Sequence, residues 1–159
     1  MTVEDMRPDD WPAVARIYEQ GLDLGTFEES VPPWEEWDAS HLAVGRLVAR
    51  EGDTIVGWAA LGPYSRRACY RGVAENSVYV APEARGQGVG RALLEELCRR
   101  ADAAGLWTIQ AATFADNSAS IALHVSCGFR LVGIRERLAQ KNGEWRDVAL
   151  LDRRSALVA

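Results

Sequence analysis

Hydrophobic residues follow two different spacings along this chain, and these spacings divide it into strands and helices. Short apolar or alternating stretches bounded by turn-forming residues predict seven strands, at residues 2–6, 42–50, 54–61, 77–81, 107–114, 130–138 and 145–152. Apolar residues three or four positions apart predict a helix that ends at Gly21, a short helix within residues 25–40, a helix over residues 91–104 and a short helix that ends at Gly128. The order of these elements is typical of a single α+β domain, residues 1–159.

Polar residues at the ends of these elements support their boundaries. Asp9 or Asp10 is placed to cap the first helix, and residues 116–118 are placed to cap the last one. Residues 51–53 separate two apolar segments, as in a hairpin, and Asn142-Gly143 is the dipeptide most typical of a tight primed turn.

The composition limits the possible partners and compartment. With 48% apolar residues and six tryptophans, the chain of 159 residues can fill one hydrophobic core. A net charge of −5 and a pI near 5.1 disfavour a nucleic acid or an anionic membrane as a general partner. Three widely spaced cysteines (Cys69, Cys98 and Cys127) and two histidines indicate neither disulfides nor a metal site. We therefore expect a protein of the reducing cytoplasm that has no signal peptide, no membrane span and no bound metal.

Residues 85–90 read Arg-Gly-Gln-Gly-Val-Gly and join a predicted strand to the helix over residues 91–104. The glycines allow a sharp turn whose N–H groups point the same way, and the helix N-terminus adds unsatisfied donors and the positive end of its dipole. Arg91-Ala92 replaces the Lys-Ser/Thr pair of a nucleoside triphosphate loop, and the glycine spacing does not fit the dinucleotide fingerprint. The loop therefore predicts a different pyrophosphate site, and a glycine-rich turn that only caps a surface helix is the alternative. The residues of the predicted site are Arg85, Gly86, Gln87, Gly88, Val89, Gly90 and Arg91.

The hexapeptide matches the acyl-coenzyme A loop Q/R-x-x-G-x-G/A of the GNAT acetyltransferases, with Arg85, Gly88 and Gly90 at the defining positions. Over essentially its whole length the chain resembles the phosphinothricin and methionine sulfoximine N-acetyltransferase branch of that family. The blocks that carry the resemblance begin at Gly25-Thr-Phe-Glu, Pro32-Pro-Trp-Glu-Glu-Trp, Gly62-Pro-Tyr-Ser, Glu75-Asn-Ser-Val-Tyr-Val, Leu123-His-Val-Ser-Cys-Gly-Phe and Asn142-Gly-Glu-Trp-Arg-Asp-Val.

The resemblance implies a fold and a cosubstrate. The implied GNAT fold has a mixed, mostly antiparallel sheet of about seven strands, with helices on both faces and the fourth and fifth strands splayed apart at a bulge. The implied cosubstrate is acetyl-CoA, whose pantetheine arm lies in the splay like an added strand. Main-chain groups of Val78 and Val80 would bind the arm, while their side chains pack as ordinary buried strand residues, and Asn117 would contact the cosubstrate from the far side.

The resemblance also assigns the proton transfers. An alkyl ammonium with a pKa of about 10.4 must lose a proton before it can attack a thioester. Glu75 matches the position of the family's general base; a solvated carboxylate at a strand edge is the alternative. His124 stands where many members carry a tyrosine that protonates the departing thiolate, and a packed core histidine is the alternative there. The Val80 N–H is a candidate donor to the oxyanion. Cys98 lies on a predicted helix face, and Cys69 and Cys127 lack a base that the sequence reveals, so we expect direct transfer in a ternary complex.

Four residues match positions that the branch uses for its substrate. Arg67 and Tyr70 would bind an amino-acid-like carboxylate, and Phe27 and Glu28 would line the same pocket. Val73 replaces a threonine that relatives commonly carry. The implied activity is acetylation of the primary amine of a small, amino-acid-like molecule by a homodimer. The alternatives are a non-catalytic acyl-CoA sensor and an acetyltransferase that acts on proteins.

Overall fold

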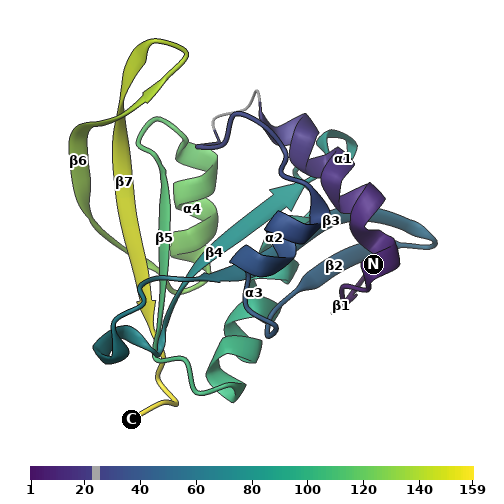
Figure 1. Ribbon diagram of the computed structural model, residues 1–159, viewed down its shortest axis with the longest axis horizontal. Helices are drawn as coiled ribbons and strands as arrows, with labels where there is room; N and C mark the ends of the chain where they lie inside the picture. The colour runs from purple at the N-terminus through teal and green to yellow at the C-terminus, as the bar shows by residue number, and fades with distance from the viewer. Residues whose placement is uncertain (23–25) are drawn as a thin grey trace.

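The computed structural model describes residues 1–22 and 26–159. Its strands are β1 (Thr2–Asp5), β2 (Leu47–Glu51), β3 (Thr54–Pro63), β4 (Val73–Val80), β5 (Thr108–Phe114), β6 (Arg130–Lys141) and β7 (Glu144–Arg154). They form one seven-stranded sheet in the order β1-β2-β3-β4-β5-β7-β6 (Figure 1). Neighbouring strands are antiparallel except β4 and β5, which are parallel. The predicted mixed, mostly antiparallel sheet is confirmed.

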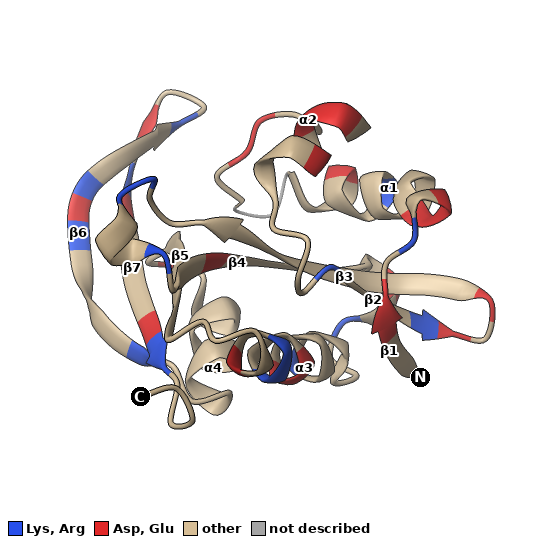
Figure 2. Ribbon diagram, turned by 60° about the horizontal axis from the view of Figure 1, so that its bottom comes forward, with Lys and Arg blue, Asp and Glu red and all other residues tan. Residues whose placement is uncertain are grey.

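Helices cover both faces of this sheet, as predicted. The helices are α1 (Trp11–Gly21), α2 (Trp34–Ser40), α3 (Val89–Ala103) and α4 (Ser118–Ser126). Figure 2 shows α1 and α2 on one side of the sheet and α3 and α4 on the other. Within the described residues, none of the helices combines the length and the apolarity that crossing a bilayer requires.

The core fills the space between the sheet and these helices. Leu93, Leu97 and Ala101 lie on one face of α3 and are fully buried, as their helical spacing predicts. On the other side of the sheet, Trp37 of α2 and Trp58 of β3 are fully buried, with ring centroids 5.8 Å apart in an edge-to-face arrangement. At least these two tryptophans therefore belong to the core.

Two strands begin several residues away from the predicted start, while β5 and β7 begin within one residue of it. β2 begins at Leu47 because Gly45 has a φ of +81° and the guanidinium of Arg46 donates to the main-chain carbonyls of His41 and Leu42. Residues 42–46 therefore form a loop. β4 begins earlier than predicted, at Val73, because its ladder with β3 continues almost to that residue.

The first helix is not capped by an aspartate side chain, contrary to the prediction. A 3-10 turn, Pro8–Asp10, precedes α1, and Asp10 itself has helical backbone angles. Its carboxylate accepts hydrogen bonds from the Arg7 N–H at 2.8 Å and from the Arg50 guanidinium at 2.5 Å. Burial raises the pKa of Asp10, but these hydrogen bonds outweigh burial and the pKa lies below its ordinary value. Asp10 thus ties the start of α1 to β2.

The sheet opens between β4 and β5. Their pairing runs only from Val73 with Thr108 to Glu75 with Gln110. Beyond Glu75, β4 stays paired with β3 up to Val80, and β5 stays paired with β7. The predicted splay is confirmed. The bulge that the resemblance implies at the splay does not appear in the pairing of β3 with β4, whose register is unbroken from Pro63 with Ala74 to Gly57 with Val80.

We expect Asp10→Asn to lower the free energy of unfolding at pH 7 by about 2 kcal/mol, because it removes a buried carboxylate that compensates the charge of the half-buried Arg50 guanidinium. The lowered pKa means that this contribution is present above the unfolded pKa of about 3.9 and is lost as the pH falls through the folded value. Urea unfolding at pH 7 and near pH 3 measures both effects. Asp9→Asn, at the exposed neighbouring position, is the control. Equal losses from the two variants would contradict the assignment.

Candidate functional site

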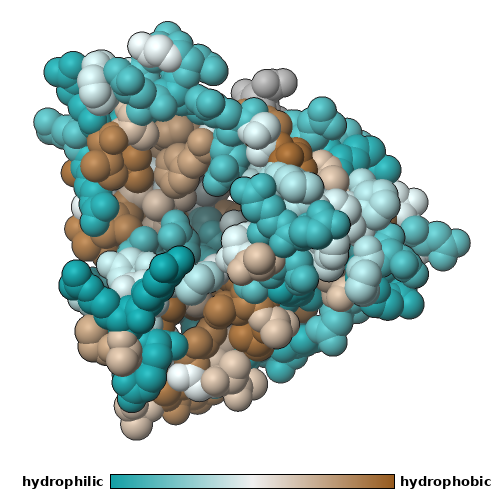
Figure 3. Space-filling view, in the orientation of Figure 1, coloured by the Kyte–Doolittle hydropathy of each residue, from teal (hydrophilic) through white to brown (hydrophobic). Residues whose placement is uncertain are grey.

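The open stretch of β4 presents main-chain groups to the gap beside β5. Ala81 donates its N–H to the Val56 carbonyl of β3 at 2.8 Å. Main-chain groups alternate in direction along a strand, so Val80 and Val78 direct theirs toward the gap. Such groups require partners when they are taken out of water. This edge is therefore suited to an extended ligand that carries amides of its own. In the view of Figure 3 the surface is hollowed near its centre, over this region.

The glycine-rich loop lies just beyond the end of the same strand. Gly86 and Gly88 have φ values of +74° and +83°, which residues with a side chain rarely adopt. The first hydrogen bond at the start of α3 runs from Ala92 N–H to the Gly88 carbonyl at 3.0 Å, so the N–H groups of residues 89–91 precede the helical ladder. A helix of 15 residues adds the positive end of its dipole. The loop has the geometry of an anion-binding site.

Close packing holds this loop against its neighbours. A Cβ atom added to Gly90 would lie 3.3 Å from Leu123 of α4 and 3.5 Å from Val80 of β4. The contact with Val80 would be ordinary, and that with Leu123 would require its side chain to move by a few tenths of an ångström. Gly90 therefore allows the start of α3 to approach α4 and β4 closely.

The side chains of the loop divide into one buried and three exposed groups. Val89 is buried in the core. Gln87 is exposed and donates to the Glu83 carbonyl at 3.2 Å. Arg85 and Arg91 are exposed, and Arg91 pairs with a carboxylate one turn further along α3. Both guanidinium groups are accessible to an anion at the loop.

Glu75 is the last residue of β4 that pairs with β5, and its side chain lies at the point where the strands part. Residues 75, 77 and 79 share one face of the strand by alternation, and Tyr79 packs against Tyr18 of α1, so this is the face that α1 and α2 cover. Burial raises the pKa of Glu75. No side chain of the described residues donates a hydrogen bond to it, so the carboxylate is free to accept a proton.

His124 lies on the opposite face of the sheet. It is buried on α4, where its Nδ1 contacts the Ser120 carbonyl at 2.7 Å and its Nε2 contacts Nδ2 of Asn76 at 3.0 Å. A carbonyl can only accept, so Nδ1 carries the proton of the neutral ring and Nε2 accepts from the Asn76 amide. Burial lowers the pKa of His124. Donation from Nε2 would therefore require an additional proton and a turn of the Asn76 amide.

Asn117 caps α4, as the sequence predicted. Its Oδ1 accepts the Ser120 N–H at 3.1 Å, so the side chain stabilises the start of the helix that carries His124.

The predicted substrate residues lie at two ends of β4. Phe27 is 42% exposed and packs edge-on against Phe114 at 4.9 Å, and Glu28 is exposed. Next to them, the Thr26 hydroxyl contacts the Tyr79 hydroxyl at 2.6 Å, near the C-terminal end of β4. Gly25, which begins the same sequence block, lies outside the described residues.

Arg67 and Tyr70 lie in the connection that precedes β4, at its other end. Arg67 is exposed and begins a 3-10 turn, Ala68–Tyr70. Tyr70 is 39% exposed and packs edge-on against Tyr64 at 5.3 Å. The two sets of predicted substrate residues thus flank Glu75 from opposite ends of the strand rather than forming one cluster.

Sequence reasoning missed two polar side chains of this region. Asn76 contacts His124, and Lys141 donates to the Leu22 carbonyl at 2.9 Å and to the Thr26 carbonyl. Asn76 follows Glu75 directly, so its place on the other face could have been read from strand alternation. Lys141 is the only lysine in the chain, but its partners lie 119 and 115 residues away and could not be read from the sequence.

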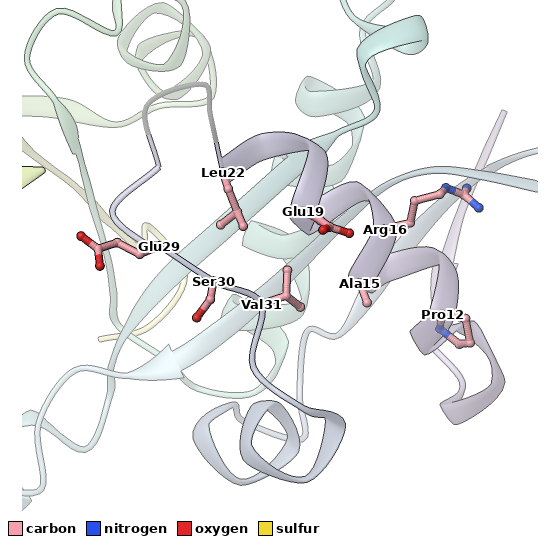
Figure 4. A pocket seen from close by; sticks show the side chains of 8 residues that line it. All are labelled: Pro12, Ala15, Arg16, Glu19, Leu22, Glu29, Ser30 and Val31. Atoms are coloured by element: carbon pink, nitrogen blue, oxygen red, sulfur yellow. The ribbon is translucent and has the colours of Figure 1, made fainter. Parts of the chain in front are cut away.

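A separate groove of about 500 Å³ lies beside α1, between that helix and residues 29–31 (Figure 4). Arg16, Glu19, Glu29 and Ser30 supply its polar lining. None of the predicted site residues lines it, so it is distinct from the gap beside β4.

Comparison with known proteins identifies the family of this chain and several relatives. The model of the Acetyltransferase (GNAT) family matches residues 7–129. The chain is 39% identical to the phosphinothricin N-acetyltransferase of Alcaligenes faecalis, over 96% of this chain and 81% of that protein. It is 39% identical to the L-methionine sulfoximine/L-methionine sulfone acetyltransferase of Pseudomonas aeruginosa, over 94% of this chain and 92% of that protein. A solved phosphinothricin acetyltransferase from Sinorhizobium meliloti, in complex with acetyl-CoA, superposes with a TM-score of 0.87 at 31% identity, over 96% of this chain and 87% of that one.

We expect Glu75→Gln to raise the melting temperature at pH 7 by about 1–3 °C, because the amide is neutral and costs less to desolvate than the carboxylate. Because the pKa of Glu75 is raised, the protonated side chain stabilises the folded protein below the unfolded pKa of about 4.3, and this stability is lost as the pH rises through the folded pKa. At pH 7 the wild type therefore bears the cost of burying a carboxylate, which the glutamine variant does not. The gain should therefore vanish below about pH 4. Differential scanning calorimetry measures it, with Glu83→Gln at an exposed position as the control. A lowered melting temperature at pH 7 would contradict the prediction.

Proposed function

Because this chain belongs to the GNAT family of acetyltransferases, we propose that it transfers the acetyl group of acetyl-CoA to the primary amine of a small, amino-acid-like substrate. The observation that carries the proposal is the position of Glu75 where β4 leaves β5. The half-buried carboxylate of Glu75 lies next to the stretch of β4 that is not paired with β5, and the glycine loop follows the end of that stretch. We propose that residues 1–159 act as one catalytic domain.

Acetyl-CoA would bind along the route that β4 provides. The pyrophosphate would lie at residues 85–91, where glycines, a helix N-terminus and two exposed arginines come together. The pantetheine arm would take the place of the missing strand, with its amides on the free groups of Val78 and Val80. Asn117, which caps α4, would border the arm from the far side. Acetyl-CoA bound to the relative from Sinorhizobium meliloti supports this choice of cosubstrate.

Glu75 would act as the general base. The substrate amine is protonated at neutral pH, with a reference pKa of about 10.4, and it must lose that proton before attack. The raised pKa of Glu75 makes its carboxylate a better proton acceptor than an ordinary surface carboxylate. The oxyanion that forms on the thioester carbonyl would need a donor close to Glu75. The Val80 N–H, the donor predicted from the sequence, points into the gap but lies five residues further along β4, where the pantetheine arm would occupy it.

The second proton transfer places different demands on His124. The departing thiolate, with a reference pKa of about 8.5, leaves with little help at neutral pH. The role of His124 as proton donor to the thiolate stays a prediction. In the alternative, the buried ring only accepts a hydrogen bond from Asn76 and so holds that side chain on the α4 face of β4.

The amino-acid-like substrate is inferred from the relatives and from Arg67, which lies in the connection that precedes β4. The two relatives at 39% identity act on phosphinothricin and on methionine sulfoximine or sulfone, as their names state. Arg67 would bind the substrate carboxylate with two parallel hydrogen bonds, with Tyr70 beside it and Phe27 and Glu28 at the other end of the strand. Val73 lacks the hydroxyl that relatives commonly carry, so phosphinothricin itself is the less favoured member of this substrate class.

We expect the wild-type enzyme to release thiol from acetyl-CoA with methionine sulfoximine or an ordinary amino acid, and Glu75→Gln to lower kcat by about 10²–10⁴-fold at pH 7. In the wild type kcat/KM should fall at acid pH as Glu75 is protonated, because only the carboxylate accepts the proton. The variant should lack this dependence. The assay is thiol release across an amine panel that includes phosphinothricin and a peptide with a free N-terminus.

Calorimetric titration with acetyl-CoA and the variant Glu83→Gln are the controls for this experiment. Binding heat without turnover of any amine would identify a sensor instead, and selective turnover of the peptide would identify a protein acetyltransferase. Full activity of Glu75→Gln at neutral pH would remove the base assignment.

We also propose that the enzyme is a homodimer formed through β6. This edge strand carries exposed apolar side chains at Leu131, Val132, Ile134 and Leu138. Apolar surface also gathers over β6 and β7 in the view of Figure 3. An open strand edge with apolar side chains favours association, and a second copy would cover both.

We expect sedimentation equilibrium to give about 35 kDa, twice the chain mass of 17.5 kDa, and Ile134→Glu to shift the protein toward the monomer by placing a charge in the buried interface. Leu157→Glu, at a position that is 80% exposed near the C-terminus, should remain dimeric. A monomeric wild type would exclude the dimer.

A further inference from the structure

Lys141 joins the β6–β7 hairpin to the segment that follows α1. It is the last residue of β6 and the only lysine of the chain. Its ammonium donates to the Leu22 carbonyl at 2.9 Å and to the Thr26 carbonyl. The same nitrogen lies 5.9 Å from the centre of the Phe114 ring at the end of β5. One side chain therefore contacts three separate parts of the fold.

The position suits a cation for a physical reason. Leu22 is the C-terminal cap residue of α1, and the last carbonyls of a helix have no helical partners and carry the negative end of its dipole. An ammonium with three donors can satisfy the carbonyls of Leu22 and Thr26 together. A neutral side chain at this position would leave them without this donor.

The segment held in this way carries predicted substrate residues. Besides the contact of Thr26 with Lys141, the Thr26 hydroxyl contacts Tyr79 of β4 at 2.6 Å, and Phe27 packs against Phe114 of β5. Residues 26–28 are thus attached to β4, β5 and the hairpin. They lie on the face of the sheet that α1 and α2 cover, whereas Gly90 of the glycine loop packs toward α4 on the other face. Among these attachments, only the one from Lys141 is charged.

We propose that Lys141 is a positioning residue for amine recognition, which holds residues 26–28 at the mouth of the gap without contacting the amine itself. This inference rests on the proposed function. According to this proposal, the affinity for the amine depends on the β6–β7 hairpin, although that hairpin carries none of the predicted site residues. It also predicts that acetyl-CoA affinity does not depend on Lys141, because residues 85–91 and the edge of β4 are anchored independently.

The kinetic test is Lys141→Met, which keeps the length of the side chain and removes the charge. The KM of the best amine should rise about tenfold or more, while kcat changes less than about threefold and the Kd of acetyl-CoA less than about twofold. Lys141→Arg should restore most of the amine affinity, because a guanidinium can donate to both carbonyls.

Arg154→Met is the matched control. Arg154 lies at the other end of the hairpin, on β7, and within the described residues its guanidinium likewise donates to main-chain carbonyls, those of Trp107, Ser155 and Val158. This variant should lower the melting temperature without changing the amine KM. An unchanged KM in Lys141→Met, an equal rise in both variants, or a parallel loss of acetyl-CoA affinity would each overturn the proposal.

A second measurement does not depend on turnover. Hydrogen exchange of the Glu28 amide, which donates to the Thr26 hydroxyl at 3.3 Å, should accelerate in Lys141→Met and not in Arg154→Met. Unchanged exchange would overturn the proposal even if KM changed. If the wild type acetylated no amine, the proposed function would fail, and this exchange would still decide whether Lys141 holds the segment.

Discussion

The separation of β4 from β5 is the constraint on which the rest of this structure depends. Main-chain groups that a parallel neighbour would satisfy remain open along β4 from Asn76 to Val80, because β4 follows β3 and β5 follows β7. A closed sheet would be more stable in isolation, since unsatisfied main-chain groups are costly when they lose water. The open edge is useful only to a ligand that restores those hydrogen bonds. The glycine loop at the end of the same strand adds the anion site that such a ligand needs, so one strand supplies both halves of the binding route.

The same strand sorts the chemistry onto two faces. Alternation directs Glu75 and Tyr79 toward α1 and α2, and it directs Asn76 toward His124 on α4. In the proposed reaction the amine would approach from the face covered by α1 and α2, and the thioester would lie in the plane of the sheet, between the two faces. Burial acts on both titratable groups but with opposite results: it raises the pKa of the carboxylate and lowers that of the imidazole, so each is biased toward its neutral form.

Local signals explain why most of the fold could be predicted. Strand and helix spacing, the Asn142-Gly143 turn with two positive φ values, and the Asn117 cap are decided by neighbouring residues. The failures arose where a side-chain contact intervened that the spacing of apolar residues does not show, one of them distant and one local. Asp10 did not cap α1 because Arg50, 40 positions away, binds its carboxylate, and β2 began late because Arg46 binds the carbonyls of its own approach segment. The splay is accompanied by no register shift between β3 and β4.

For the site, the sequence determined the residue types and the glycine loop, because the conformations of Gly86 and Gly88 and the start of α3 are local properties of consecutive residues. It placed Glu75 just before a predicted strand at residues 77–81, whereas β4 begins at Val73 and includes Glu75. Only the tertiary structure decided what surrounds these groups: that Arg67 and Phe27 flank Glu75 from opposite ends of β4, that Asn76 occupies Nε2 of His124, and that Lys141 reaches the end of α1. Burial, pKa and the pairing of polar groups depend on residues that are far apart in the chain, and no spacing rule along the sequence specifies which of them meet.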